Sequence, residues 1–409
     1  MALVLEGGTL IDGSGRDPAA GTRVVVVDGE RIVSVGGRRP RDAEPLEVAG
    51  LTVLPGLIDL HTHMGILSVS DPEAMPPAVA AARLFRNAEL CLLSGHTTAR
   101  EVAGADGGLR QAIDAGLIPG PRLFPSGPAL CQSGGHGDLG PAFLPHHHDP
   151  GTPGLAQMSI VCDGPDGVRV AARTAFRRGA TQLKMIISGG VVSLTDRIED
   201  AQFTVEELRA AVVEARARDT YVTGHAHNVA SIRNGLEAGL ECFEHGTFLD
   251  EPTAAQMAAA GAALVPTLTA IRLLASEWRA WGVPEAVLPR VAGAEEAARE
   301  AVKIAYAAGV TVGSGTDILG PEQNRRGLEL ALKAEIVGPM EAIVSATATN
   351  ARILRRGHEL GTVEAGKLAD LIAVDGDPLA DPALFDDPDR VALVIQGGRV
   401  VKDTRSQAA

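Results

Sequence analysis

The sequence has few aromatic residues, few cysteines and no excess of basic charge. Only 3% of its 409 residues are aromatic, namely Phe 8, Trp 2 and Tyr 2. This scarcity argues against the stacking platforms on which proteins hold single-stranded nucleic acid, and it predicts a core of Ala, Val, Leu and Ile. The cysteines number four and form no CxxC pair. They therefore indicate neither a disulfide framework nor a thiolate metal site.

The sequence also lacks a secretory leader, a membrane span and a basic binding surface. Its first residues, MALVLEGGTLIDG, contain no basic segment before an apolar run, and the charge-free stretch 257–271 is interrupted by Pro266. We therefore expect no signal peptide and no membrane-spanning helix. The formal net charge of -14 repels phosphate backbones and anionic lipids. Together these features predict a cytoplasmic protein with reduced thiols and without a nucleic-acid or membrane partner.

The two ends of the chain predict a small β domain. Residues 2–55 alternate short β-rich runs with Gly and Asp-Gly turns, which is typical of a small antiparallel sheet. Near the other end, GTVEAGKLADLIAVDGDP and ALVIQGGRVVKD have the same strand-turn-strand character. We expect residues 1–55 and 350–409 to form one β-sandwich, with residues 56–349 inserted between them as a second domain.

The middle of the chain predicts an α/β domain. Apolar runs alternate with Ala-rich helical patterns, and the helix expected over 204–218 begins with a capping box formed by Thr204 and Glu207. Eight repeats of this kind match a (β/α)8 TIM barrel, whose active site lies at the C-terminal ends of its strands. The expected strands are LIDLHTH, GHTTARE, RLFPSG, QLKMIIS, TYVTGHA, LECFEHG, AALVPTL and VTVGSGTD.

Side chains that can bind a metal lie at the ends of these runs. His61 and His63 end the first run, and because they are two residues apart on a strand, both imidazoles face the same side. The other candidates come from the fourth, fifth, sixth and eighth runs and are Lys184, His225, His245 and Asp317. Neutral imidazole and carboxylate suit zinc or a similar divalent ion. The pattern therefore predicts a metal centre at the mouth of the barrel.

Lys184 is the unusual member of this set. An ammonium group beside divalent cations is repelled and desolvated, and both effects lower its pKa toward the neutral amine. A neutral amine can add carbon dioxide to form a carbamate, which has carboxylate-like oxygens that can bridge two metal ions. We therefore expect a carbamate on Lys184.

Motifs along nearly the whole chain resemble those of the amidohydrolase superfamily. They are PGLIDLHTH, QLKMIISGGVVSLTD, TGHAHN, FEHG, GSGTD and GTVEAGKLADLIAVDGDP. Two further segments, GLIPGPRLFPSGPAL and SGGHGD, resemble the prolidase-like branch. That branch includes metal-dependent dipeptidases, an arginine carboxypeptidase and ochratoxin-hydrolysing amidases.

The resemblance implies two divalent metal ions, expected to be Zn²⁺, and a bridging hydroxide as the nucleophile. His61, His63 and Asp317 would hold the first ion. His225 and His245 would hold the second, and carbamylated Lys184 would lie between the two ions. The resemblance also makes Asp317 the catalytic residue that takes up the proton of the hydroxide and delivers it to the departing amine.

The expected reaction is cleavage of an amide C–N bond in a small molecule, either a dipeptide or an N-acyl amino acid with a free carboxylate. The resemblance implies that His136 and His227 contact the substrate, although many relatives have Tyr at the position of His227. Specificity is expected from loops that contain Arg272, Arg325 and Arg326. Because relatives commonly assemble, a homo-oligomer is expected.

Three other interpretations remain open. The first is hydrolysis of a cyclic amide such as an imidazolone, or deamination. The branches with these activities lack the lysine of the fourth strand and carry an acidic residue just after the histidine of the fifth strand. This chain has Lys184, and Ala226 and His227 follow His225. Hydrolysis of an aryl amide, a carbamate or a urea uses the same nucleophile. A metal-free scaffold protein should show gaps among the ligands, and the sequence has none. The triplet His146 to His148 is interpreted as a loop outside the site.

Overall fold

The computed structural model describes residues 2–18, 24–37, 39–68, 75–139, 151–152, 155–192, 196–283, 285–320 and 323–405. By the contacts among its residues the chain divides into two compact units. The first unit consists of Met1–Asp59, Glu89–Thr98 and Asn324–Ala409, and the second of Leu60–Ala88 and Ala99–Gln323. The triplet His146 to His148 lies outside the described residues.

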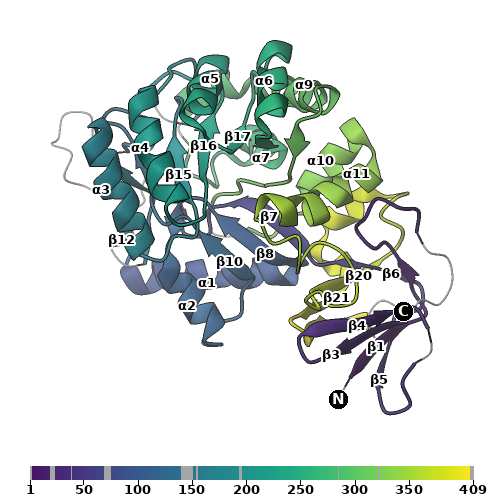
Figure 1. The fold of residues 1–409 in the computed structure, drawn as a ribbon. Coiled ribbons are helices and arrows are strands. Elements are labelled where there is room, and N and C mark those ends of the chain that lie inside the picture. Colours follow the sequence, from purple (N-terminus) through teal and green to yellow (C-terminus); the bar gives the residue numbers. More distant parts are fainter. Residues whose placement is uncertain are drawn as a thin grey trace. The chain divides into compact units, whose positions relative to one another are not determined.

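A parallel sheet forms the centre of the second unit (Figure 1). Its seven strands lie in the order β14 (Ser159–Val161), β11 (Ala129–Cys131), β15 (Leu183–Ile186), β16 (Val222–Ala226), β17 (Cys242–His245), β18 (Ala263–Val265) and β19 (Thr311–Val312). Each strand pairs with its neighbours in parallel register. From β15 to β19 the sheet order follows the chain order, which requires a crossover after each strand.

Two smaller sheets contain the remaining strands of this part of the chain. One has the order β10 (Arg122–Pro125), β8 (His96–Glu101) and β7 (Leu57–Thr62), and the other has the order β12 (Gly151–Thr152), β13 (Ala156–Gln157) and β9 (Gly104–Ala105). Each of the eight runs expected to be a strand contains one, so those predictions and the α/β class are confirmed.

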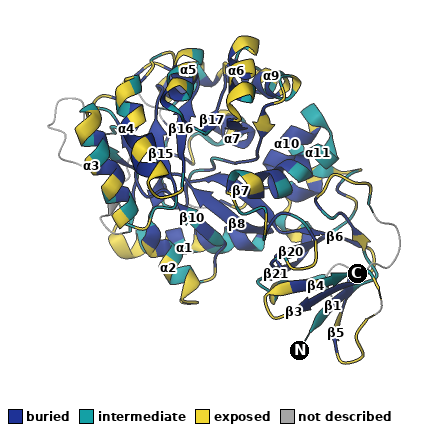
Figure 2. Cartoon of the chain, viewed as in Figure 1, coloured by how far each residue is buried: buried dark blue, intermediate teal, exposed yellow. Residues whose placement is uncertain are grey.

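Helices connect the strands and carry their apolar faces toward the sheet. In Figure 2 the central strands β15, β16 and β17 are dark blue, whereas α3 and α4 also show yellow on the side away from the core, as amphipathic helices do. The predicted capping box is confirmed, since Thr204 accepts from the backbone N–H of Glu207 and the Glu207 carboxylate accepts from that of Thr204. The helices are α1 (Pro77–Leu93), α2 (Gly107–Asp114), α3 (Gly164–Arg177), α4 (Val205–Arg216), α5 (Val229–Ala238), α6 (Glu251–Ala260), α7 (Leu268–Glu277), α8 (Leu288–Val291) and α9 (Ala294–Ala307).

The core of the second unit is aliphatic, as predicted. Its main buried cluster consists mostly of Ala, Val, Leu and Ile, and Phe203 and Phe243 are the only aromatic members among its buried residues. Small alanines on α3 and α4 let these helices pack closely against each other and against the strands. The four cysteines are all buried, and none of them forms a disulfide.

The first unit contains two sheets. One has the order β4 (Arg31–Val35), β3 (Val25–Asp28), β1 (Leu3–Glu6) and β5 (Glu44–Glu47), and the other has the order β2 (Thr9–Leu10), β6 (Leu51–Pro55), β20 (Leu371–Asp375), β21 (Val391–Gln396) and β22 (Arg399–Asp403). One apolar cluster draws residues from both sheets, including Val27 from β3 and Leu393 from β21. The unit also holds α10 (Leu328–Val337), α11 (Pro339–Val344) and α12 (Asn350–Ile353).

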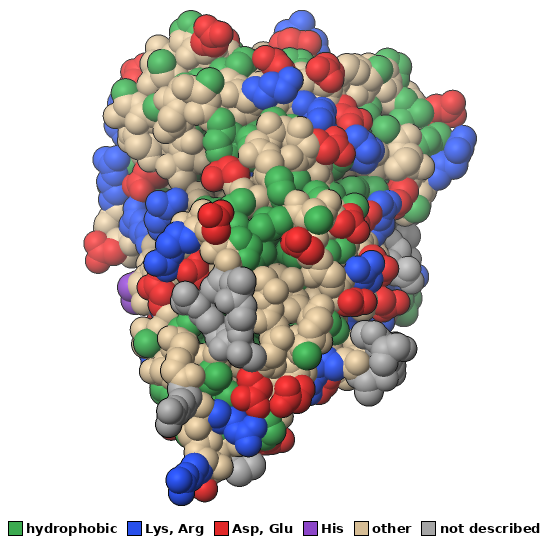
Figure 3. Space-filling model, turned by 90° about the vertical axis from the view of Figure 1, so that its right-hand side faces the viewer, with side chains coloured by type: hydrophobic (Ala, Val, Ile, Leu, Met, Phe, Trp, Pro, Cys, Tyr) green, Lys and Arg blue, Asp and Glu red, His purple; other side chains and the backbone are tan. Residues whose placement is uncertain are grey.

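The surface is mixed in charge on the face that Figure 3 displays. Acidic and basic side chains alternate over it, and its described residues form no broad area of one sign. Among the helices in the described part of the chain, none combines the length and the apolar character that crossing a bilayer requires.

Candidate metal centre

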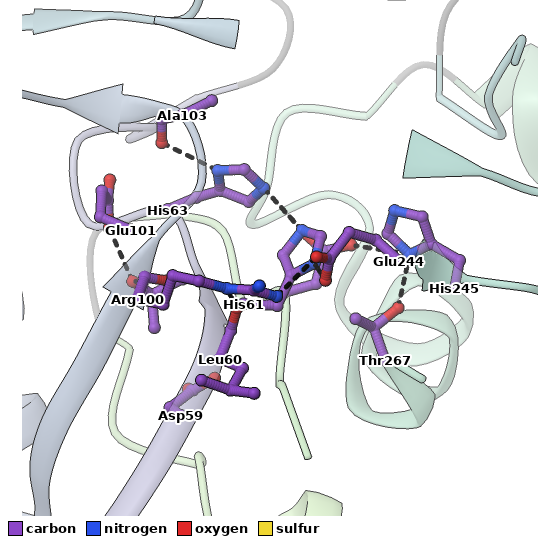
Figure 4. Close-up of polar contacts among 12 residues, drawn as sticks. Asp59, Leu60, His61, His63, Arg100, Glu101, Ala103, Glu244, His245 and Thr267 are labelled. Atoms are coloured by element: carbon purple, nitrogen blue, oxygen red, sulfur yellow. Dashed lines mark hydrogen bonds and ion pairs between the residues drawn. The ribbon is translucent and has the colours of Figure 1, made fainter. Parts of the chain in front are cut away.

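His61 and His63 lie at the C-terminal end of β7 and turn their rings toward each other. The Nδ1–H of His61 donates to Glu244 Oε2 at 2.7 Å, and the Nδ1–H of His63 donates to the carbonyl of Ala103 at 2.9 Å. With their Nδ1 atoms held in this way, the two Nε2 atoms come within 3.1 Å of each other (Figure 4). This tautomer leaves both Nε2 lone pairs available for a ligand in the space that they share.

Asp317 reaches the same space from the loop that follows β19. Its Oδ1 lies 3.1 Å from His63 Nε2 and 3.4 Å from His61 Nε2. We expected Asp317 at the end of the eighth strand, but β19 ends at Val312. The loop is held instead by a backbone hydrogen bond from Asp317 N–H to the His61 carbonyl at 2.8 Å, and Asp317 has a φ of 56°. A left-handed conformation in a residue other than glycine is typical of functional sites, where the surrounding structure supports the strain.

His225 and His245 come from adjacent parallel strands, β16 and β17, and their ring centroids are 4.5 Å apart. His245 ends its strand with a φ of 69°. Its Nδ1 is hydrogen-bonded to Thr267 Oγ1 at 2.7 Å, while its Nε2 is buried without a hydrogen-bond partner. A buried imidazole nitrogen without a partner is costly unless something binds to it.

Lys184 lies within β15 and is 3% exposed. It lines the same cavity as the four histidines and Asp317. Burial lowers the pKa of its amine to about 8. A fraction of the amine is therefore neutral near neutral pH, as the sequence predicted from its surroundings.

His136 and His227 complete a cluster of six imidazoles. The ring of His136 stacks on that of His225 at 4.7 Å, and the ring of His227 stacks on that of His245 at 4.7 Å. Thr247 Oγ1 lies 2.8 Å from His227 Nδ1, which fixes the orientation of that ring. Both residues line the cavity, as expected for groups that contact a substrate.

Burial controls the protonation of this cluster. It lowers the pKa of His61 to about 4 and that of His227 to about 3, and it lowers the pKa of His225 and of His245 well below the ordinary value. Burial also opposes the protonation of His63, but the neighbouring Asp317 outweighs it and raises the pKa of His63. Four of the imidazoles are therefore neutral at physiological pH, and a neutral imidazole is the form that binds metals.

The donor atoms fit divalent cations. Donors of His61, His245 and Asp317 lie within 4.8 Å of one another, and so do donors of His225, His227 and His245. Imidazole nitrogens and a carboxylate oxygen are the donors that zinc prefers. The Nδ1 atoms of three rings are held by protein acceptors, and the Nε2 atom of His245 is left unpartnered. These residues therefore suit a metal centre with two adjacent positions.

Sequence reasoning missed the buried residues behind these ligands. Glu244 accepts from His61 and from Arg100, and both of its neighbours are fully buried (Figure 4). The signal was present, because Arg100 and Glu244 are charged residues inside apolar runs. A second buried carboxylate, that of Asp59, pairs with Arg326 at 2.7 Å.

The rest of the cavity wall is apolar. It includes Ile271 and Leu274 from α7, Trp281, and Leu319 in the loop that carries Asp317. Among its described lining residues the only charged side chains are Lys184 and Asp317. The wall therefore suits an uncharged, apolar group beside the metal centre.

The loops expected to set specificity contain three arginines, and none of these arginines is among the residues that line the cavity. Arg272 pairs with Glu295, Arg325 with Asp386, and Arg326 with Asp59. A buried guanidinium such as that of Arg326 requires a carboxylate partner of this kind. That these loops set specificity stays a prediction.

Comparison with known proteins agrees with this geometry. Residues 52–401 match the model of the amidohydrolase family. Ochratoxinase from Aspergillus niger is 32% identical over 420 residues, which cover 98% of this chain and 86% of the relative. The crystal structure of a prolidase complexed with N-methylphosphonate-L-proline superposes on this chain with a TM-score of 0.93. Its sequence is 38% identical, and the match covers 98% of this chain and 100% of the prolidase chain.

A second solved structure is similar to this chain. It is that of a Xaa-Pro dipeptidase with bound methionine in the active site, which is 31% identical with a TM-score of 0.88; the match covers 98% of this chain and 100% of the dipeptidase chain. The expected family and its prolidase-like branch are confirmed. The chain belongs to the amidohydrolase family and is a hydrolase that acts on amide bonds.

Proposed function

We propose that this protein hydrolyses the amide bond of a dipeptide or an N-acyl amino acid at a centre of two divalent metal ions. One observation carries the proposal. Side chains from β7, β15, β16, β17 and the loop after β19 surround a single cavity. They are the residues expected from the sequence to bind the ions, namely His61, His63, Lys184, His225, His245 and Asp317.

The two ions are assigned to two groups of ligands. His61, His63 and Asp317 would hold the first ion, and His225 and His245 would hold the second; we propose Zn²⁺ for both. Bound divalent ions supply Lewis acidity for the scissile carbonyl and lower the pKa of the attacking water. Zinc is favoured over a harder cation because most of the donors are imidazole nitrogens.

Lys184 is proposed to carry a carbamate. Its neutral amine nitrogen forms a bond to the carbon of carbon dioxide and releases one proton, which leaves an anionic group with two oxygens. Burial lowers the pKa of Lys184 to about 8, which supports this step because only the neutral amine is nucleophilic. A carbamate also replaces a cation by an anion at the position where two divalent ions are expected.

Asp317 is the proposed catalytic residue for proton transfer. Burial opposes its ionisation, but His61 and His63 outweigh it and lower the pKa of Asp317. The carboxylate is therefore ionised and can accept a proton from the attacking water. The same carboxyl group then donates this proton to the nitrogen of the leaving amine, so that the amine departs uncharged.

His136 and His227 are proposed to contact the substrate. Both rings line the cavity next to the metal ligands, and with its Nδ1 bonded to Thr247, His227 keeps Nε2 for a carbonyl or carboxylate oxygen. The apolar wall around Trp281 is proposed to receive the side chain or the acyl group. The names of the prolidase and of the Xaa-Pro dipeptidase, which resemble this chain, support a dipeptide as the substrate.

The proposal extends to the architecture and the setting of the protein. We propose that residues 56–349 form a closed (β/α)8 barrel, which is supported by backbone hydrogen bonds from Leu60 to Ser314 and from Val102 to Thr62. Residues 1–55 and 350–409 are proposed to form a β-sandwich, supported by the apolar cluster that both sheets share. Four buried cysteines that form no disulfide support a cytoplasmic location, and a homo-oligomer is proposed from the resemblance to relatives that assemble.

The test combines metal analysis with a substrate panel. Purified protein should contain about two zinc-like ions per chain, and a chelator should abolish hydrolysis, which added Zn²⁺ should restore. The panel compares Xaa-Pro dipeptides, Xaa-Arg dipeptides, N-acyl amino acids and aryl amides. Full activity in metal-free protein would overturn the proposed mechanism, and hydrolysis of aryl amides alone would overturn the proposed substrate.

A further inference from the structure

We propose that Arg100 and Glu244 are positioning residues that hold His61 in the geometry and tautomer needed to bind the first metal ion. This inference rests on the proposed metal centre and extends it to two residues that line no part of the described cavity. Figure 4 shows both next to His61, with Glu244 in contact with His61 and with Arg100.

Glu244 controls the side chain of His61. Its Oε2 accepts the Nδ1–H of His61 at 2.7 Å, so that the proton stays on Nδ1 and the lone pair of Nε2 remains available. Glu244 is fully buried. Its other oxygen, Oε1, accepts from Arg100 at 2.5 Å. Both carboxylate oxygens are therefore engaged, which holds the acceptor for His61 in place.

Arg100 controls both the backbone before His61 and the carboxylate behind it. Its Nε donates to the carbonyl of Leu60 at 2.6 Å, and one terminal nitrogen donates to Glu244 Oε1 at 2.5 Å. Leu60 is the residue that precedes His61 in β7. One rigid guanidinium thus fixes the position of His61 through the main chain and through its hydrogen-bond acceptor.

Two further hydrogen bonds hold Arg100 and Glu244 in place. Arg100 also donates to the hydroxyl of Tyr221 at 3.1 Å, and the hydroxyl of Thr223 donates to Glu244. The charges of Arg100 and Glu244 compensate each other beneath a centre where cations are expected. Without Glu244 the guanidinium would be an uncompensated cation close to the first ion, so loss of this carboxylate should weaken metal binding both by freeing the ring and by repulsion.

The experiment measures the binding and release of zinc in Glu244→Gln. Glutamine keeps an oxygen acceptor but removes the charge. We expect the affinity for the zinc ion assigned to His61, His63 and Asp317 to fall about 10- to 100-fold and the release of that ion to accelerate. Competition with a chromophoric chelator measures both quantities. The second ion should be retained as in the unsubstituted protein.

Glu101→Gln is the matched control. Glu101 follows Arg100 on β8 and is equally buried, but it accepts from the Thr62 hydroxyl and from the backbone amides of Met64 and Ala105 rather than from an imidazole. The same substitution there should change zinc affinity less than about threefold. An equal loss in both variants would show that any buried carboxylate has this effect, and would overturn the proposal.

A double variant separates positioning from folding. Glu244→Gln alone leaves a buried guanidinium without its carboxylate, which destabilises the fold. In Arg100→Met with Glu244→Gln both charges are absent, so the melting temperature of the metal-free protein should recover while zinc binding stays weak. Recovery of wild-type zinc binding in the double variant would mean that only the unpaired charge mattered, and would overturn the positioning role.

The outcomes also separate this proposal from the proposed function. If the unsubstituted protein binds no divalent ion, the metal centre and the positioning role both fail. If it binds two ions and Glu244→Gln binds them with the same affinity and release rate, the metal centre stands and the positioning role alone is refuted.

Discussion

Two buried lysines in this protein have the same shifted pKa and different surroundings. Lys184 in β15 and Lys333 in α10 are both buried, and burial lowers the pKa of each to about 8. Lys184 lines a cavity among imidazoles. Lys333 donates to Ser345 Oγ at 3.2 Å and lies near the carboxylate of Glu329. A lowered pKa therefore does not by itself identify a functional lysine; ligand atoms facing a shared cavity do.

Two aspartates, one buried and one partly exposed, show a second contrast of this kind. Asp59 pairs with Arg326, and neither side chain is exposed. Asp317 faces the Nε2 atoms of His61 and His63, and its side chain is 19% exposed. Asp59 thus compensates one fixed charge, whereas Asp317 borders open space and several neutral donors. Exchange of a proton or a ligand is feasible only at the second kind of position.

The largest effect is expected from Lys184→Ala. Removal of this side chain removes the group proposed to join the two metal ions, so kcat/KM for amide hydrolysis should fall by at least about 10³-fold, which equals about 4 kcal/mol of transition-state stabilisation. The metal content should fall below two ions per chain. Steady-state kinetics and metal analysis on the same preparation measure both quantities.

Lys333→Met is the control for this substitution. It leaves the nearby acidic groups without their cation and should lower the free energy of unfolding by about 3–5 kcal/mol. The folded molecules should keep their metal ions and their kcat/KM. If the Lys333 variant lost activity as completely as the Lys184 variant, the distinction between a structural and a functional lysine would be wrong.

The next effect is expected from Asp317→Asn. The amide has nearly the same shape as the carboxylate but cannot accept the proton of the attacking water, so kcat should fall by about 10²–10³-fold. Asp59→Asn changes the same group in the first unit, where it breaks the pair with Arg326, and its main effect should be on stability. Urea unfolding and kinetics of both variants test this comparison, and a larger loss of activity in the Asp59 variant would contradict it.

The positions of the metal ligands could be predicted because the relevant rule is local. Parallel strands of an α/β domain present their C-terminal ends at one edge, so His61, His63, His225 and His245, each at or near the end of an apolar run, were expected to converge. The structure brings them to one cavity. The capping box at Thr204 could be predicted for the same reason, since its partner is only three residues away.

The contacts behind the ligands could not be predicted, because they join residues far apart in the sequence. Arg100 and Glu244 are separated by 144 positions, and only the strand order brings them together. The partner of Arg326 was missed for the same reason, because Asp59 is 267 positions away. The exact place of Asp317 depended on a backbone hydrogen bond to His61, which no local pattern reveals.

A smaller effect compares the two tryptophans of the chain. Trp281 is buried and lines the cavity, whereas Trp278 lies under the guanidinium of Arg279 at 4.3 Å and is not among the lining residues. In Trp281→Leu we expect kcat/KM for substrates with a bulky apolar group to fall by about tenfold, while glycine-containing substrates change little. Trp278→Leu should leave the preference unchanged. Equal effects of the two substitutions on all substrates would mean that Trp281 does not set specificity.

The smallest effect concerns stability alone and compares two buried histidines. Burial lowers the pKa of both His61 and His96 to about 4, but His96 lies outside the cavity and bonds to the Ser94 hydroxyl at 3.0 Å. As the pH falls below 6.5, His96 takes up a proton in the unfolded chain but not in the folded protein. The free energy of unfolding therefore decreases until the folded ring also titrates near pH 4.

The substitution His96→Asn removes this pH-dependent contribution to stability. Between pH 7 and pH 4.5, the free energy of unfolding of the variant should therefore decrease by about 2–3 kcal/mol less than that of the unsubstituted protein. Urea unfolding of metal-free protein at both pH values measures the difference, and parallel declines would show that His96 is protonated in the folded state or accessible to water.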